Sequence, residues 1–238
     1  MPIQVLQHRR VHEQIAEQLR TLVASGEYPP GGRLPPEREL AVRLGVSRGS
    51  LRQALVALEV GGVLDIRVGS GVFVTADALT RVHHWTPGDG AGLPPLDIVA
   101  ARALVESETA ALAAENATDE QLRGVVLAAA SLRDAEHRYD LRHPADRAFH
   151  LRIAEASGNR ALLHLVTELW DCQRGPLYRR LEDHFSTPRM RDLAIDDHQA
   201  IVDALLGRDP SRARRAMRRH LDRVHAGLAA GAGNKAGG

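Results

Sequence analysis

The sequence predicts a mainly α-helical protein, in which an N-terminal winged helix-turn-helix precedes an all-α antiparallel helical bundle. Three observations lead to this prediction. Residues 34–74 encode a helix, a tight turn, a second helix and a glycine-rich hairpin in succession. Beyond residue 96 only helical patterns with clear stops follow. Aromatic residues make up 3% of the chain, so the core must be built from Leu, Ala and Val, and the abundance of Leu and Ala favours helices.

The first predicted helix is amphipathic and ends at Gly26 and the Pro29–Gly32 breaker run. Its apolar positions recur at helical spacing, at Val11, Ile15, Leu19, Leu22 and Val23.

The helix-turn-helix is predicted to begin near Pro36, which suits the first turn of a helix. Gly45 can take the left-handed conformation that ends this helix, and Ser47 is a good N-cap for the next one. In the second helix Leu51, Leu55 and Leu58 face the core. This register is expected to turn three polar side chains outward near the N-terminal end, those of Arg48, Ser50 and Arg52.

A hairpin follows, with apolar runs at 63–66 and 72–74 separated by Gly69, Ser70 and Gly71. The second helix of such a fold is shaped to enter the DNA major groove. Because the net charge is only +1, charge alone does not indicate nucleic acid, and a solvated helix face is the alternative for these arginines.

The N-terminal part of the chain resembles the GntR family of bacterial transcription regulators. The resemblance lies in residues 33–41, 46–48, 51–55, 58–59 and 69–74. The resemblance implies that Arg38, Arg48 and Arg52 contact DNA and that Gly69 approaches the minor groove. An arginine fork can read guanine or clamp a phosphate. Ser47 and Ser50 complete the DNA-binding candidates.

Length, at 238 residues, predicts two domains. We expect a DNA-binding domain at 1–76, a linker with room for a short helix at 77–95, a helical bundle at 96–229 and a disordered tail at 230–238. No apolar run of membrane-spanning length and no signal peptide is found, and the single Cys172 cannot form an internal disulfide, so a cytoplasmic protein is expected.

The bundle helices are predicted near 96–114, 119–138, 144–157, 160–181, 188–206 and 210–229. Thr118 with Gln121 forms a capping box, Thr187-Pro188 and Asp209-Pro210 are N-cap pairs, and Gly175-Pro176 should kink or break the fourth helix.

Four polar side chains lie on faces that are otherwise apolar. Asp146 and His150 are one turn apart, His198 shares a stripe with Ala194, Ile201 and Leu205, and His220 shares one with Met217 and Val224. Once buried, these groups need partners. A divalent transition metal would satisfy all four, with zinc expected first and nickel or manganese as alternatives.

A single histidine is more often a hydrogen-bonded core or surface residue than a metal ligand. His164 lies in an apolar run and could be mistaken for a ligand. The motifs around Asp146 and His150, around Asp197 and His198, and around His220 resemble the ligand motifs of the FCD domain, the effector domain of the FadR subfamily. The resemblance implies a metal held by Asp146, His150, His198 and His220.

Arg102 is a further charge on an apolar face, shared with Ile98, Val105 and Thr109. The structural interpretation of Arg102 is an i,i+4 ion pair with Glu106. The functional one is a clamp for an effector carboxylate, because a buried guanidinium needs an opposite charge. The run from Arg102 to Glu106 is similar to the subfamily's Arg-x-x-x-Glu signature, whose arginine often binds effectors.

The sequence therefore predicts a homodimer that binds a palindromic DNA operator and responds to a small organic acid held beside the metal. Repression relieved by the metabolite is the expected logic, although activation obeys the same thermodynamics. One alternative is a regulator for which the ion itself is the signal. The other is a metalloenzyme fused to a DNA reader, for which we find no convincing general base.

Overall fold

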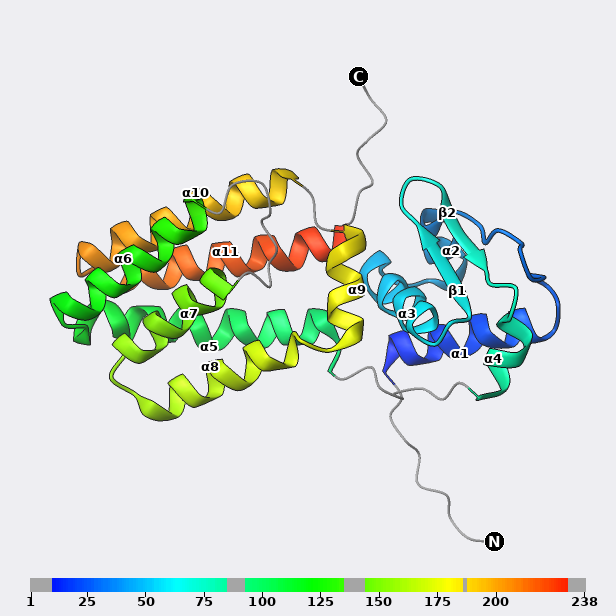
Figure 1. The fold of residues 1–238 in the computed structure, drawn as a ribbon, viewed down its shortest axis with the longest axis horizontal. Helices are drawn as coiled ribbons and strands as arrows, with labels where there is room; N and C mark the ends of the chain where they lie inside the picture. Colours follow the sequence, from blue (N-terminus) through cyan, green and yellow to red (C-terminus); the bar gives the residue numbers. More distant parts are fainter. Residues whose placement is uncertain (1–9, 85–92, 135–143, 186–187, 231–238) are drawn as a thin grey trace, which may run out of the picture. The chain divides into compact units, whose positions relative to one another are not determined.

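The computed structural model describes residues 10–84, 93–134, 144–185 and 188–230 (Figure 1). The chain divides into two compact units, Met1–Gly92 and Leu93–Gly238. Each unit buries its own set of apolar side chains. Across the described ranges, no helix has the combination of length and apolar character that crossing a membrane would require.

The first unit contains a helical core made of α1 (Val11–Ala24), α2 (Glu37–Leu44) and α3 (Arg48–Val60). Helix α3 contacts both α1 and α2. Helix α1 buries one face, as its amphipathic pattern predicts, through Ile15, Ala16, Leu19 and Val23.

The turn between α2 and α3 is set by two residues. Gly45 adopts a φ of +65°, in the left-handed region that glycine occupies without steric cost. Two residues later the side chain of Ser47 accepts the backbone N–H of Ser50 at 3.0 Å and so caps α3. Both residues act as predicted, and they fix where the second helix of the motif begins.

The hairpin forms an antiparallel two-stranded sheet from β1 (Leu64–Arg67) and β2 (Gly71–Val74). Leu64 faces Val74 in the register, and the connecting turn places Gly69 at a φ of +78°. The two strands, joined by this glycine-containing turn, form the wing of the predicted winged helix-turn-helix.

A short helix, α4 (Ala78–His84), follows the wing and packs against α1. Its side chains Ala78 and Val82 are fully buried. The first unit therefore continues past residue 76, where the sequence suggested that a linker begins. Residues 85–92 of that segment and 231–238 of the expected tail lie outside the described residues.

In the described residues of the second unit, all the regular secondary structure is helical. Its helices are α5 (Pro95–Asn116), α6 (Asp119–Asp134), α7 (Pro144–Ala156), α8 (Arg160–Cys172), α9 (Pro176–Phe185), α10 (Pro188–Leu206) and α11 (Pro210–Ala230). This unit and the winged motif together confirm the mainly α-helical fold class.

Helix α5 is the central element of this bundle, since it contacts α7, α8, α9, α10 and α11. Figure 1 shows α5 and α11 side by side and running in opposite directions, with α9 crossing the bundle at one end. The largest core cluster consists mainly of Ala, Leu, Val and Ile, with Phe149 as its single aromatic residue. The low aromatic content thus matches a core of small and aliphatic side chains.

Local signals place most of the helix ends. The backbone N–H of Thr118 donates to Gln121 Oε1 at 2.8 Å and the N–H of Gln121 to Thr118 Oγ1 at 3.2 Å, which is the predicted capping box. Asp209 caps α11 by accepting the N–H of Arg212 at 2.9 Å.

The predicted helix over 160–181 is two helices in the structure. It breaks between Cys172 and Pro176, because Pro176 cannot continue the backbone hydrogen bonds of α8. Thr187 and the expected helical residues 135–138 lie outside the described part of the chain.

Candidate metal centre and DNA-binding face

Five of the six predicted DNA-contact residues are accessible on the first unit. Arg38 on α2 and Arg48 on α3 are exposed, and so are Ser47 at the start of α3 and Gly69 at the wing tip. Ser50 is half-buried, and its hydroxyl lies 2.9 Å from that of Ser47. Arg48, Ser47 and Ser50 present one guanidinium group and two hydroxyl groups at the N-terminal end of α3, the helix that such folds insert into DNA, and Arg38 adds a second guanidinium group from α2.

The prediction that Arg52 faces outward is wrong. Its side chain is only 5% exposed, and its Nε donates to Glu37 Oε2 at 2.8 Å. The physical reason is that Glu37, in the first turn of α2, offers a carboxylate to the guanidinium while the aliphatic stem of Arg52 is buried. Arg52 therefore connects α2 to α3.

In the second unit, three histidines from three helices meet in the interior. They are His150 on α7, His198 on α10 and His220 on α11, and each is at most 2% exposed. One ring nitrogen from each lies within 4.8 Å of the other two. The apolar stripes of these helices explain why the imidazoles point inward.

Asp146 lies against this group from the preceding turn of α7. Its Oδ1 is 3.3 Å from His198 Nε2 and 3.6 Å from His150 Nε2. The structure thus brings together the four side chains that the sequence predicts as metal ligands.

Two of the three imidazoles, those of His198 and His220, are in a protonation state that suits metal coordination. Burial, reinforced by the neighbouring imidazoles and by Arg102, lowers the pKa of His198 and of His220 well below the usual value for histidine. At neutral pH these rings are therefore neutral and have a free lone pair.

Several buried ring nitrogens lack a hydrogen-bond partner within the described structure, namely His150 Nε2, His198 Nδ1, His198 Nε2 and His220 Nδ1. Leaving a buried polar group unsatisfied costs about 1–3 kcal/mol. Neutral imidazoles with one carboxylate are an ordinary ligand set for a divalent transition metal. The donor set and its unsatisfied nitrogens fit such an ion.

Glu106 on α5 also belongs to this site. The sequence predicted it only as an ion-pair partner of Arg102. Its Oε1 accepts Arg102 Nε at 2.6 Å, while its Oε2 contacts His150 Nδ1. Burial opposes ionisation of Glu106, but Arg102 and His150 outweigh it and lower the pKa of this carboxyl to about 2. The ionised carboxylate orients His150 through the ring nitrogen that does not face Asp146.

Arg102 points inward, as predicted, and is 3% exposed. Its guanidinium carbon lies 3.9 Å from the centre of the Trp170 ring, in addition to the ion pair with Glu106. The i,i+4 pair with Glu106 is thus real, and it is buried rather than solvated.

Two polar side chains near Arg102 were not found from the sequence. Burial raises the pKa of Tyr178 above its usual range, although Arg102 opposes the shift. Gln173 Nε2 donates to the Tyr178 hydroxyl at 3.1 Å. The break at Gly175-Pro176 was the one available signal, because it separates α9, which carries Tyr178, from the end of α8.

His164 lies on α8 and is exposed, so it does not belong to the cluster. Its place in an apolar run of the sequence is therefore no guide to burial.

Comparison with known proteins gives a match over both units. Residues 11–74 match the family described as bacterial regulatory proteins, gntR family, and residues 97–223 match the FCD domain. The Exu regulon transcriptional regulator of Escherichia coli K12 is 31% identical, over 92% of this chain and 85% of that protein.

Two further relatives are similar to the same extent. The Uxu operon transcriptional regulator of Escherichia coli K12 is 33% identical, over 91% of this chain and 86% of its own length. The HTH-type transcriptional repressor NanR of Klebsiella aerogenes is 32% identical, over 93% of this chain and 86% of its own length.

Proposed function

Because this chain belongs to the bacterial GntR family of transcriptional regulators and carries an FCD domain, we propose that it is a metabolite-responsive repressor. In this proposal its helical bundle binds a divalent metal and a small organic acid. Its relatives are transcriptional regulators and not enzymes, so the metalloenzyme alternative is set aside. One of them is itself named a repressor.

The convergence of Asp146, His150, His198 and His220 carries the metal half of the proposal. Their donor atoms come from three helices into a region from which solvent is excluded, and buried ring nitrogens have no hydrogen-bond partner in the described ranges. A bound ion would supply positive charge and coordination sites. We expect zinc, with nickel or manganese as alternatives.

The proposal that the bundle binds a small organic acid rests on Arg102. A carboxylate effector would be attracted by this buried guanidinium, near Trp170 and Tyr178. Four protein ligands would leave up to two positions on a six-coordinate ion, in reach of a small carboxylate. Since Glu106 already neutralises Arg102, the effector would have to share this arginine or displace part of its ion pair.

For DNA binding, we propose that two chains form a dimer and bind a palindromic operator in the bacterial cytoplasm. Arg38, Arg48, Ser47, Ser50 and Gly69 would form the contact face of each copy, with Arg52 at its buried edge. An effector that prefers one arrangement of the DNA-binding units changes operator affinity by linkage, typically 5- to 150-fold.

The ion pair of Arg102 with Glu106 favours a second candidate function, that of a metal-responsive regulator. If Arg102 is fully occupied by Glu106, no carboxylate is required and the metal itself would be the signal. Operator affinity would then follow metal concentration without any organic acid.

The test is His198→Ala. We expect this variant to lose most of its bound metal, because one ligand is removed from an enclosed site. Metal content is measured by elemental analysis of purified protein, and operator affinity by DNA titration with and without candidate small acids. The matched control is His164→Ala, which removes an exposed histidine and should keep full metal content. Full occupancy in His198→Ala would refute the ligand set.

A further inference from the structure

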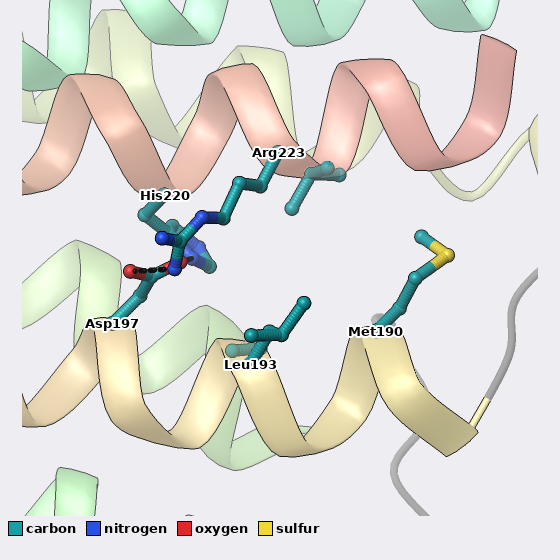
Figure 2. A pocket seen from close by; sticks show the side chains of 7 residues that line it. Met190, Leu193, Asp197, His220 and Arg223 are labelled. Carbon is teal, nitrogen blue, oxygen red and sulfur yellow. Dashed lines mark hydrogen bonds and ion pairs between the residues drawn. The ribbon is translucent and has the colours of Figure 1, made fainter. Parts of the chain in front are cut away.

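A small cavity of about 40 Å³ lies between α10 and α11, beside the histidine cluster (Figure 2). One part of its wall is apolar and the other is polar. It is lined by Met190, Leu193, Ala194, Val224, Asp197, His220 and Arg223. Figure 2 shows Arg223 reaching from α11 to Asp197 on α10, with His220 behind this pair.

The two carboxylate oxygens of Asp197 have different surroundings. Oδ1 accepts Arg223 Nη1 at 2.7 Å and Arg219 Nε at 3.3 Å. Oδ2 has no hydrogen-bond partner among the described residues, although the side chain is only 3% exposed. The two arginines are about half exposed, at 48% and 45%, so they hold the carboxylate from the solvent side. The free lone pairs of Oδ2 are left on the inner side.

A ring nitrogen of His220, one of the predicted metal ligands, lies near Oδ2. His220 Nδ1 is 4.0 Å from Asp197 Oδ2, and within the described part of the chain it has no hydrogen-bond partner either. This separation is roughly 1 Å longer than an N–H···O bond. A single bridging water needs about 10–15 Å³ and at least two polar partners, and the adjoining cavity offers both.

His150 provides the comparison within the same site. Its Nδ1 is engaged by a buried carboxylate, Glu106, which is in turn paired with Arg102. Asp197 has a related place beside His220: it is a buried carboxylate held by arginines, and its Oδ2 lies 4.0 Å from a ring nitrogen, without a direct hydrogen bond. Metal-ligating histidines commonly donate their second ring N–H to a carboxylate, which fixes the tautomer and the ring orientation.

We propose that Asp197 is a positioning residue of the metal centre, which takes the Nδ1–H of His220 directly or through one water. This inference rests on the proposed function, because it presupposes that His220 is a ligand. The bond leaves His220 Nε2 to face the ion. Arg219 and Arg223 hold Asp197 in place by its other oxygen, so that both ends of the carboxylate are engaged.

The experiment compares Asp197→Ala and Asp197→Asn with the unmodified protein by titrating Zn²⁺ against a chromophoric chelator. We expect Asp197→Ala to bind Zn²⁺ about 10- to 100-fold more weakly, the usual effect of losing such a partner. Asp197→Asn keeps the shape and a weaker acceptor, so its affinity should lie between the two. The matched control is Asp196→Asn, which removes the neighbouring charge on the exposed face of α10 and should leave Zn²⁺ affinity unchanged.

The outcomes separate this inference from the proposed function. No Zn²⁺ binding by the unmodified protein would overturn both. Zn²⁺ binding that is equally tight in Asp197→Ala and in the unmodified protein would overturn this inference alone. A loss of thermal stability with unchanged Zn²⁺ affinity would do the same, because it would make Asp197 only a link between α10 and α11.

A second measurement covers the case in which Asp197→Ala does not fold. Nitrogen-15 spectra of the histidine rings in the Zn²⁺-loaded, unmodified protein report which nitrogen carries the proton. We expect the Nδ1–H tautomer at His220, with Nε2 bound to the ion. Metal bound at His220 Nδ1 would contradict the assignment, whatever the variants do.

Discussion

At the N-terminal end of α3, two arginines four residues apart have different environments. Arg48 is exposed on the first turn, whereas Arg52 is buried and paired with Glu37. A long, exposed guanidinium is free to reach a base edge or a phosphate. A buried one is committed to the protein unless the ion pair opens.

We therefore predict that Arg48→Ala weakens operator binding by about 1–3 kcal/mol and leaves metal content intact. Arg52→Ala should weaken operator binding by more than about 1 kcal/mol and should also destabilise the first unit, since it leaves Glu37 without its partner. DNA titration and thermal unfolding of both variants check this. Unchanged operator affinity in Arg48→Ala would show that α3 is not the reading helix.

At the residue scale, the sequence predicts which histidines are buried better than it predicts the contacts that buried side chains make with other helices. The apolar stripes around His198 and His220 indicate burial correctly, because stripe position depends only on helical periodicity. The ion pair between Arg52 and Glu37 and the contact of Glu106 with His150 depend on how separate helices pack. Periodicity within one helix carries no information about them.

At the scale of elements, the junction of α2 and α3 depends on the backbone of Gly45. A side chain at a φ of +65° costs about 1–2 kcal/mol, and no heavy atom lies within 4 Å of the position that a Cβ would take. The cost of a substitution there is thus conformational and not a clash.

Gly45→Ala should lower the free energy of unfolding of the first unit by about 1–2 kcal/mol. Gly45→Asn should lower it less, because asparagine tolerates the left-handed region better than alanine. Thermal unfolding of the full chain, with operator affinity as a second readout, compares the two. Equal stability of Gly45→Ala and the unmodified protein would contradict the conformation assigned to this turn.

Element boundaries could be predicted where the signal is local. The capping box of Thr118 and Gln121, the Ser47 cap and the break before Pro176 all involve neighbouring residues. The packing of α4 was less visible, because burial of Ala78 and Val82 depends on their contact with α1. A single turn or two of helix gives too short a pattern to reveal its buried face.

At the scale of the whole molecule, the chain joins a DNA-binding unit to a bundle with a polar, ionisable cluster in its interior. Buried ionisable groups such as Asp146, His150 and Glu106 are costly in an apolar core, unless they hold a ligand or one another. A regulator needs such a site, because a ligand can shift an equilibrium only through its differential affinity for two states. The proposed metal and acid site would provide that difference.

If an ion is held among these helices, anomalous diffraction from crystals of the Zn²⁺-loaded protein will locate it. We predict one strong anomalous peak in each chain, bounded by Asp146, His150, His198 and His220. Loaded crystals with no peak there, or with zinc bound only elsewhere, would show that these four side chains do not form a metal site.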